Sequence, residues 1–303
     1  MSGVAWLSVY AQISTLLLPV ICCAAIGALW AIKKKPYPDE FIATLATVVS
    51  TPALVFHTLM TTSLNNSQLL EVGGASLLGL AVAALLGSMG LRAMKLPVFT
   101  LGPAATFPNA GNLGLPIAQL AFGEMGLAVA IIFFAINSVV QHTLGVWVAT
   151  RGGDHAHRWP KGVVVACLLA AVFRATDSTV PIPLIESTQL VGSLAVPLML
   201  LSLGYALATV SRAGIRQGAL LAALRLFAGL LAGAVVVYAL DLPPLVASVL
   251  TLQLAMPVAV VSAIYVQRFS NYGDVAAGAV LVSTAAFVVL CPLLVWLAGT
   301  HRF

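Results

Sequence analysis

The sequence predicts an all-α integral membrane protein whose ten transmembrane helices form two inverted five-helix repeats. Of its 303 residues, 61% are hydrophobic and 8% are charged, and the mean hydropathy is +1.06. Soluble domains average about 25% charged residues, so this composition indicates a chain that lies mostly in lipid. Apolar runs of about the 20 residues needed to cross a bilayer recur along the chain. Prolines also recur at similar places in its two halves.

Each predicted span is an apolar run bounded by polar or basic residues. In chain order, the ten runs cover residues 11–32, 41–64, 69–91, 97–122, 127–150, 162–175, 188–210, 217–240, 245–266 and 275–299. The sixth run is short and is expected to extend toward Ile182. These boundaries divide the chain into a first repeat at 1–150, a cytoplasmic connecting loop at 151–161 and a second repeat at 162–303.

Two pairs of prolines indicate the repeat. Pro52 in the second span corresponds to Pro197 in the seventh, 145 residues later. Pro108 in the fourth span corresponds to Pro257 in the ninth, 149 residues later. An odd number of spans in each repeat inserts the second copy upside down relative to the first. Coincidence is the alternative, because 16 prolines offer many pairings.

Basic residues predict the orientation. Lysines and arginines follow odd-numbered spans eleven times and lie on the opposite side twice, at Arg174 and Arg302. Because loops rich in Lys and Arg stay in the cytoplasm, both termini are expected outside the cell membrane. The same clustering accounts for the net charge of +5 without a nucleic-acid partner. Arg225, inside the eighth span, is expected to lie near its cytoplasmic end, where a long side chain reaches water, with attraction of an anionic substrate as the alternative.

The fourth and ninth spans are predicted to be broken helices. The stretch Thr106–Pro116 holds two prolines, two glycines and two asparagines inside an apolar run. Non-helical backbone at membrane depth persists only where protein buries it or where it lines a cavity, so a binding site is expected at the breaks. The break residues predicted from this pattern are Pro108, Gly111, Gly114, Pro116, Met256 and Pro257.

Polar side chains near the breaks are the predicted substrate ligands. Where a helix restarts at mid-membrane, its free N–H groups carry a partial positive charge that suits a carboxylate. Asn109, Asn112 and Gln253 lie at the breaks, and Asn137 and Gln141 share one face of the fifth span. Amide groups bind anions or hydroxyls. Two alternatives stay open: the amides satisfy the freed backbone, or they hydrogen-bond between helices.

Other polar and sulfur-containing residues carry weaker signals. His57 and His142 are candidates for a proton relay, with structural hydrogen bonding as the alternative. The cysteines form no metal-binding spacing and are expected to be small buried thiols. Nor does the chain contain a nucleotide-binding phosphate loop, an HExxH motif or paired intramembrane aspartates. We therefore expect neither an enzyme nor a bound cofactor or metal.

Several motifs together resemble the auxin efflux carrier family, including its bacterial branch of malonate transporters and other permeases. They are Phe107-Pro108-Asn109, Gly114-Leu115-Pro116, Gln253–Pro257, Tyr265–Arg268 and Pro52–His57. The resemblance covers essentially all ten spans and is most specific in the fourth and ninth. One difference is the short loop between the halves, where plant auxin carriers have a long cytoplasmic segment.

The resemblance implies a fold similar to the bile-acid sodium symporters. Spans 1, 2, 6 and 7 would then form a scaffold, and spans 3–5 and 8–10 a mobile transport domain that moves like an elevator. It also implies a homodimer in a bacterial inner membrane, with the broken helices crossing at the bilayer centre. The predicted function is secondary transport of a small organic anion such as malonate or an auxin-like acid. An anion channel or membrane-embedded sensor is the alternative, and uniport, exchange, proton coupling and sodium coupling all stay open.

Overall fold

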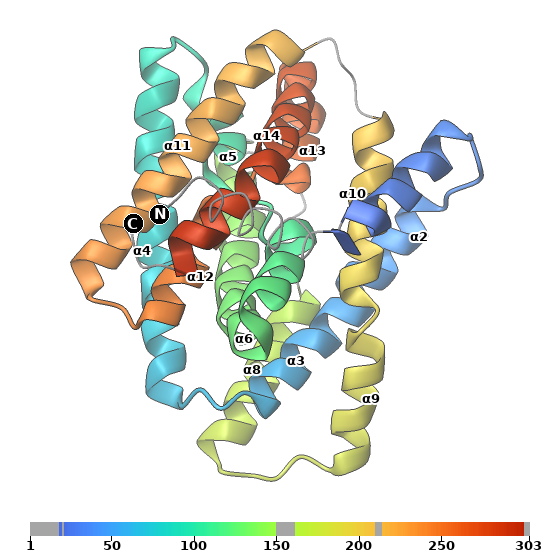
Figure 1. The fold of residues 1–303 in the computed structure, drawn as a ribbon, viewed down its shortest axis with the longest axis vertical. Coiled ribbons are helices and arrows are strands. Elements are labelled where there is room, and N and C mark those ends of the chain that lie inside the picture. The colour runs from blue at the N-terminus through green and yellow to red at the C-terminus, as the bar shows by residue number, and fades with distance from the viewer. Residues whose placement is uncertain (1–17, 20, 150–160, 210–213, 300–303) are drawn as a thin grey trace, which may run out of the picture.

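The computed structural model describes residues 18–19, 21–149, 161–209 and 214–299, and its secondary structure in these ranges is helical apart from one isolated β-bridge. Within these ranges, five helices are long and apolar enough to cross a membrane: Asn66–Ala93, Ala110–Ala149, Ile182–Thr209, Ile215–Leu240 and Gly273–Trp296. The prediction of an all-α membrane protein is therefore confirmed (Figure 1).

The first half of the chain begins with an apolar helix at Ile21–Ile32. The helices that follow are α2 (Asp39–Thr44), η1 (Leu45–Ser50), α3 (Thr51–Thr61), α4 (Asn66–Ala93), α5 (Val98–Thr106), η2 (Ala110–Gly114), α6 (Leu115–Val140), η3 (Gln141–Gly145) and α7 (Val146–Ala149). The three η segments are π-helical, a wide form that is rare in general and frequent at functional sites.

The second half contains both long and short helices. They are α8 (Lys161–Ala175), α9 (Ile182–Gly192), α10 (Ala195–Thr209), α11 (Ile215–Leu240), α12 (Pro244–Leu254), α13 (Val260–Phe269) and α14 (Gly273–Gly299). The predicted seventh span is thus interrupted between α9 and α10. Pro197 accounts for this, since it has no N–H to donate to the carbonyl of Ser193.

The chain turns back on itself within α6. Gly123 has a non-helical backbone with φ of 67°, a conformation that glycine adopts without strain. A Cβ added to Gly111 would lie 2.9 Å from a ring carbon of Phe134. In a continuous helix these two residues would be about 34 Å apart. Residues 110–149 therefore form a hairpin with its turn at Gly123, close to the boundary predicted between the fourth and fifth spans.

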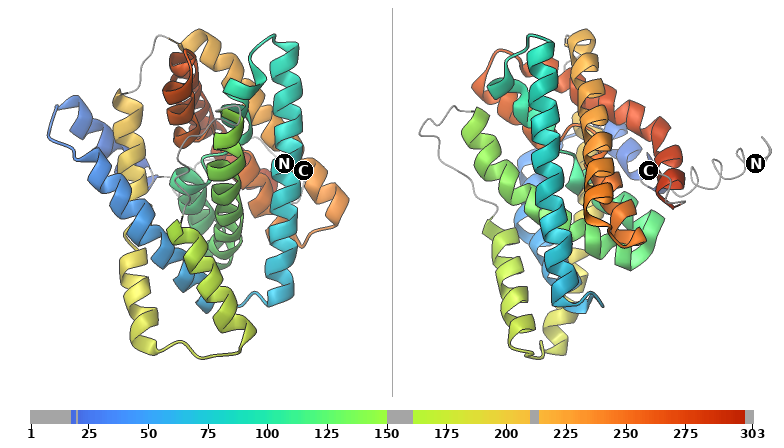
Figure 2. Two further views of the ribbon diagram at one scale, coloured as in Figure 1. Left: turned by 180° about the vertical axis from the view of Figure 1, so that it is seen from behind. Right: turned by 90° about the vertical axis from the view of Figure 1, so that its left-hand side faces the viewer.

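The helices form two groups. One contains α2, α3, α8, α9 and α10, which pack against one another on one side of the molecule (Figures 1 and 2). In the other, α11 packs along both α4 and α14, while α5, α6, α12 and α13 fill the centre. The assignment of a scaffold and a transport domain remains a prediction, as does the inverted ten-helix repeat.

Candidate functional site

The two broken helices cross and satisfy each other's backbone. Between α5 and η2, Pro108 forms an antiparallel β-bridge with Val258, which lies between α12 and α13. The N–H of Asn109 donates to the carbonyl of Pro257 at 2.8 Å, and the N–H of Ala259 donates to the carbonyl of Phe107 at 3.2 Å. These bonds pair groups that would otherwise be costly at membrane depth.

A serine completes the pairing at the crossover. The N–H of Val258 donates to the Ser283 hydroxyl on α14 at 3.1 Å. Pro108 and Pro257 have no N–H that needs a partner. The Asn109 side chain is therefore not needed by these backbone groups, and its Nδ2 is buried without a hydrogen-bond partner.

Two helices begin at the crossover and turn their N-termini toward one cavity. The first carbonyl bonds inside η2 run from Leu113 and Gly114 back to Asn109. The first bond of α13 runs from Ala263 to Ala259 at 3.3 Å. The N–H groups ahead of these bonds have no partner within their own helix. Both starts, at residues 110–112 and 259–261, line the same cavity.

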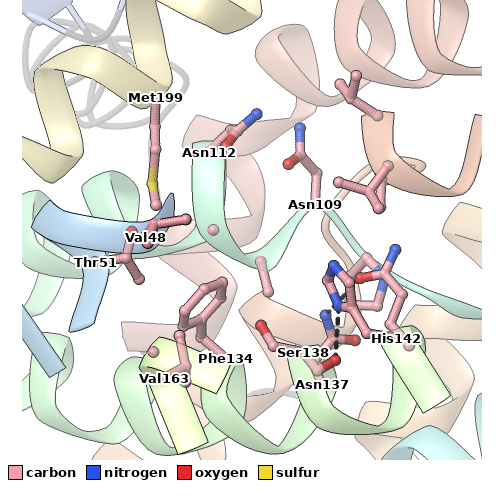
Figure 3. Close-up of a pocket in the computed structure, with 18 of the residues that line it drawn as sticks. Val48, Thr51, Asn109, Asn112, Phe134, Asn137, Ser138, His142, Val163 and Met199 are labelled. Carbon is pink, nitrogen blue, oxygen red and sulfur yellow. Dashed lines mark hydrogen bonds between the residues drawn. The ribbon is translucent and has the colours of Figure 1, made fainter. Parts of the chain in front are cut away.

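The cavity has a volume of about 580 Å³ and lies between the two groups of helices. Its first side consists of residues from α2, η1, α3, α8 and α10: Thr44, Val48, Thr51, Lys161, Gly162, Val163 and Met199. The second side consists of the crossover and the α6–η3 helix: Pro108–Asn112, Phe134, Asn137, Ser138, Gln141, His142 and Ala259–Val261. Figure 3 shows Val48, Thr51 and Met199 facing Asn109 and His142 across the cavity.

All three π-helical segments contribute to this cavity. Val48 comes from η1, residues 110–112 from η2, and Gln141 and His142 from η3. Pro52, in the first turn of α3, accounts for the wide turn in η1 because it cannot donate to the carbonyl of Val48. In the same turn, the Thr51 hydroxyl donates to the carbonyl of Ala46 at 2.6 Å.

Four of the five predicted ligands line the cavity: Asn109, Asn112, Asn137 and Gln141. The fifth, Gln253, is fully buried outside the lining, and a Cβ on Gly114 would lie 2.0 Å from its Oε1. Among the predicted break residues, Pro108 and Gly111 line the cavity, whereas Gly114, Pro116, Met256 and Pro257 lie behind it. Pro116 lies in the first turn of α6, directly after η2, and has no N–H to donate to the carbonyl of Asn112.

A chain of polar side chains runs behind the cavity wall. Asn137 Nδ2 donates to Gln141 Oε1 at 3.4 Å, and Gln141 Nε2 donates to Ser262 Oγ at 3.0 Å. Ser262 Oγ in turn donates to the carbonyl of Pro103 in α5 at 3.1 Å. The chain connects the fifth predicted span to both broken helices.

The two histidines have different surroundings. His142 lines the cavity, donates from Nδ1 to the carbonyl of Ser138 at 2.8 Å and meets Tyr265 edge to face. His57 lies outside the cavity lining, with its Nδ1 3.2 Å from the carbonyl of Ile185. Of the two, only His142 is placed to meet a ligand in this cavity.

The prediction for Arg225 was wrong. Its side chain is fully buried, and Nη2 donates to the carbonyl of Leu254, the last residue of α12, at 2.6 Å. Nε and Nη1 have no hydrogen-bond partner. The side chain does not reach water because the end of α12 supplies an unpaired carbonyl. Arg225 is the one charged residue among the buried side chains that the structure describes.

Sequence reasoning missed the first side of the cavity. Lys161 is exposed at the start of α8 and places a cation on the lining, and Met199 and Val48 make this side apolar. These residues belong to runs that look like ordinary spans or loops, so no local pattern singles them out. Pro52, in the first turn of α3 directly after η1, was the available signal, since it marks an irregular helix opposite the breaks.

Comparison with known proteins identifies the family. An "uncharacterized transporter" from Methanothermobacter thermautotrophicus (strain Delta H) is 29% identical over 196 residues, which is 63% of this chain and 65% of that protein. The chain thus aligns with less than two thirds of that relative's length. Residues 12–159 and 159–297 match the family described as membrane transport proteins. The resemblance to the auxin efflux carriers is therefore confirmed, and the chain belongs to this membrane transport protein family.

Proposed function

We propose that the protein is a secondary transporter that carries a small organic anion across the membrane. One observation carries the proposal: the N-termini of η2 and α13 meet at a single cavity of about 580 Å³, beside the unpaired amide nitrogen of Asn109. Each helix N-terminus is equivalent to roughly +0.5 charge. Two such ends, together with the unpaired Asn109 Nδ2, favour a carboxylate.

The remaining charges support an anionic cargo. Lys161 adds a positive charge at the exposed edge of the cavity. Arg225 binds the carbonyl at the end of α12 and so offsets the partial negative charge of that helix terminus. The buried side chains that the structure describes include no aspartate or glutamate.

The position of the cavity supports an elevator mechanism. It lies between the group formed by α2, α3, α8, α9 and α10, proposed as the scaffold, and the group that contains the crossover, proposed as the moving domain. An anion bound at the crossover would travel with the moving domain while the first side stays in place. Lys161 is the last residue of the loop predicted to be cytoplasmic, so the cavity in this state is proposed to face the cytoplasm.

The proposal is tested by anion binding to the purified protein. Malonate, succinate and phenylacetate are titrated against the parent chain, with and without sodium. Loss of a hydrogen bond to a charged ligand costs about 1.5–3 kcal/mol, so Asn109→Ala is expected to weaken binding roughly 10- to 150-fold. Asn271→Ala, at an exposed asparagine far along the chain, is the matched control. Equal affinity in the parent and Asn109→Ala would place the anion elsewhere.

Counterflow in proteoliposomes distinguishes a carrier from a channel or sensor. A carrier preloaded with the bound anion should accumulate labelled anion transiently from outside and saturate with its concentration. A channel would show neither effect, and a sensor would bind the anion without moving it.

A further inference from the structure

The hydrogen bonds behind the cavity wall have a fixed direction. A carbonyl oxygen can only accept, so Ser262 must donate its single proton to Pro103. The Ser262 oxygen then accepts from the Gln141 amide nitrogen at 3.0 Å. This turns the carbonyl oxygen of Gln141 toward Asn137, which donates to it from Nδ2 at 3.4 Å. Each link thus sets the orientation of the next.

The chain of hydrogen bonds therefore ends at Asn137, a cavity-lining residue whose carbonyl oxygen is left as a hydrogen-bond acceptor. Asn137 Oδ1 is buried without a partner, in a side chain that is only 2% exposed. Asn109, whose side chain is 5% exposed, presents the opposite group, because its unpaired atom is the donor Nδ2. Both residues line the same cavity. An unsatisfied buried polar atom is costly, and neither amide finds a second partner among the described residues.

A simple carboxylate matches one of these two atoms. Its oxygens accept from Asn109 and from the N–H groups that begin η2 and α13, but an ionised carboxylate has nothing to donate to Asn137. A rotation of the Asn137 amide cannot exchange its oxygen and nitrogen without breaking the bond to Gln141. The acceptor is therefore held in place by a carbonyl more than thirty residues away, at Pro103.

We infer that the transported anion carries a hydrogen-bond donor, a hydroxyl or an N–H, in addition to its carboxylate. This inference rests on the proposed function and specifies its substrate. The carboxylate occupies the crossover beside Asn109, and the donor satisfies Asn137 Oδ1. Carbon atoms between the two groups lie against the apolar lining of Val48, Phe134 and Met199.

Matched pairs of acids that differ only in the donor test the inference. The pairs are lactate and propionate, malate and succinate, and 4-hydroxyphenylacetate and phenylacetate, each titrated in sodium chloride and in choline chloride. If the donor bonds to Asn137 Oδ1, the hydroxylated member of at least one pair should bind roughly 5- to 150-fold more tightly than its partner. Equal binding within every pair would overturn the inference and leave anion binding intact. No binding by any member would count against the proposed function itself.

Ser262 provides a second readout, as a positioning residue that has no need to touch the ligand. Ser262→Ala removes the link that orients Gln141. The ratio of the affinities for the hydroxylated and the plain acid should therefore fall toward one, while the affinity for the plain acid stays within about threefold of the parent's. Ser270→Ala is the matched control, because its hydroxyl donates only to the carbonyl of Val266 in the same helix, at 2.7 Å. Unchanged preference in Ser262→Ala would contradict the orienting role. Tight binding of both pair members only in sodium would also overturn it, because a cation would then fill the acceptor.

Discussion

Arg225 binds the carbonyl of Leu254 at the point where α12 stops, with 2.6 Å between Nη2 and the oxygen. A Cβ on Gly229 would lie 2.0 Å from the same oxygen. Helix α11 therefore packs so close to the break that no residue larger than glycine fits at position 229. The bond gives the crossover a buried positive charge on its far side. It also satisfies a carbonyl that the break leaves without an intrahelical donor.

This charge is expected to strengthen anion binding. Arg225→Gln retains a donor for Leu254 but removes the charge, whereas Arg225→Lys keeps the charge. At an effective dielectric of about 20, two unit charges at a separation on the order of 10 Å interact by about 1–2 kcal/mol; an effect of this size would make Arg225→Gln bind the anion roughly 5- to 30-fold more weakly. Arg225→Lys should remain closer to the parent. Calorimetry measures the anion affinity of the parent and of both variants. Equal affinity in the parent and Arg225→Gln would limit Arg225 to a structural role.

Substitutions at Gly114 and Gln253 are expected to have coupled effects on the stability of the protein, and substitution of Gln253 alone is expected to leave anion affinity nearly unchanged. A Cβ at Gly114 would lie 2.0 Å from Gln253 Oε1, and overpacking of this kind typically costs about 1–3 kcal/mol. Gly114→Ala should therefore lower the thermal unfolding midpoint, and adding Gln253→Ala should restore part of the loss. Gln253→Ala alone should leave anion affinity within about twofold, because its side chain lies outside the cavity lining. A large loss of affinity in that variant would return Gln253 to the binding site.

Arg174 is expected to hold the α3–α4 connection against α8. Its guanidinium donates to the carbonyls of Leu59 and Leu64 and to Asn66 Oδ1, the first of these at 2.8 Å. Arg174→Gln should lower the free energy of unfolding by about 1.5–3 kcal/mol, as for other charged hydrogen bonds. Anion affinity should not change. Arg216→Gln, at an exposed arginine on the opposite predicted side, is the control and should show no such loss.

The orientation predicted from the basic residues can be tested by labelling. In a cysteine-free background, Ser67→Cys at the exposed start of α4 should react with an impermeant maleimide from outside intact cells. Lys35→Cys, in the first basic loop, should react only after the membrane is permeabilised. The opposite pattern would invert the topology and place the cavity mouth outside.

The elevator proposal predicts that joining η2 to α10 stops transport. Leu113 and Leu200 belong to one buried apolar cluster across the two proposed domains. Cysteines at both positions, bridged by mercuric ion, should block counterflow and leave anion binding within about threefold. Thiol treatment should restore transport. Full turnover of the bridged protein would show that these two helices do not slide past each other.

The breaks themselves could be predicted from the sequence because their cause is local. Pro108 and Pro257 each lie inside an apolar run of membrane-spanning length, where a proline removes a backbone donor and kinks or breaks the helix. Asn137 and Gln141 could also be predicted to share a face, because four residues make about one turn. The structure places both on the cavity and bonds them to each other.

Contacts between distant segments could not be read from the same patterns. Gln141 and Ser262 are 121 residues apart, and no local feature of Ser262 indicates that its proton goes to α5. Gln253 lies beside the second break, like Asn109 beside the first, yet the turn of α12 directs it toward Gly114. Arg225 could have been placed near water or near a buried carbonyl, and only packing against Leu254 decides between them.

The burial of Arg225 has a consequence for how the membrane potential acts on the protein. Carrying one elementary charge fully across the membrane changes the energy by about 2.3 kcal/mol per 100 mV. If the proposed moving domain takes Arg225 part of that distance, the empty carrier moves as a cation, and the negative interior draws it inward. A bound monoanion cancels this charge, so the loaded carrier moves with little electrical work. Exchange of anion for anion would then be nearly independent of voltage, whereas net transport would respond to it through the return of the empty carrier.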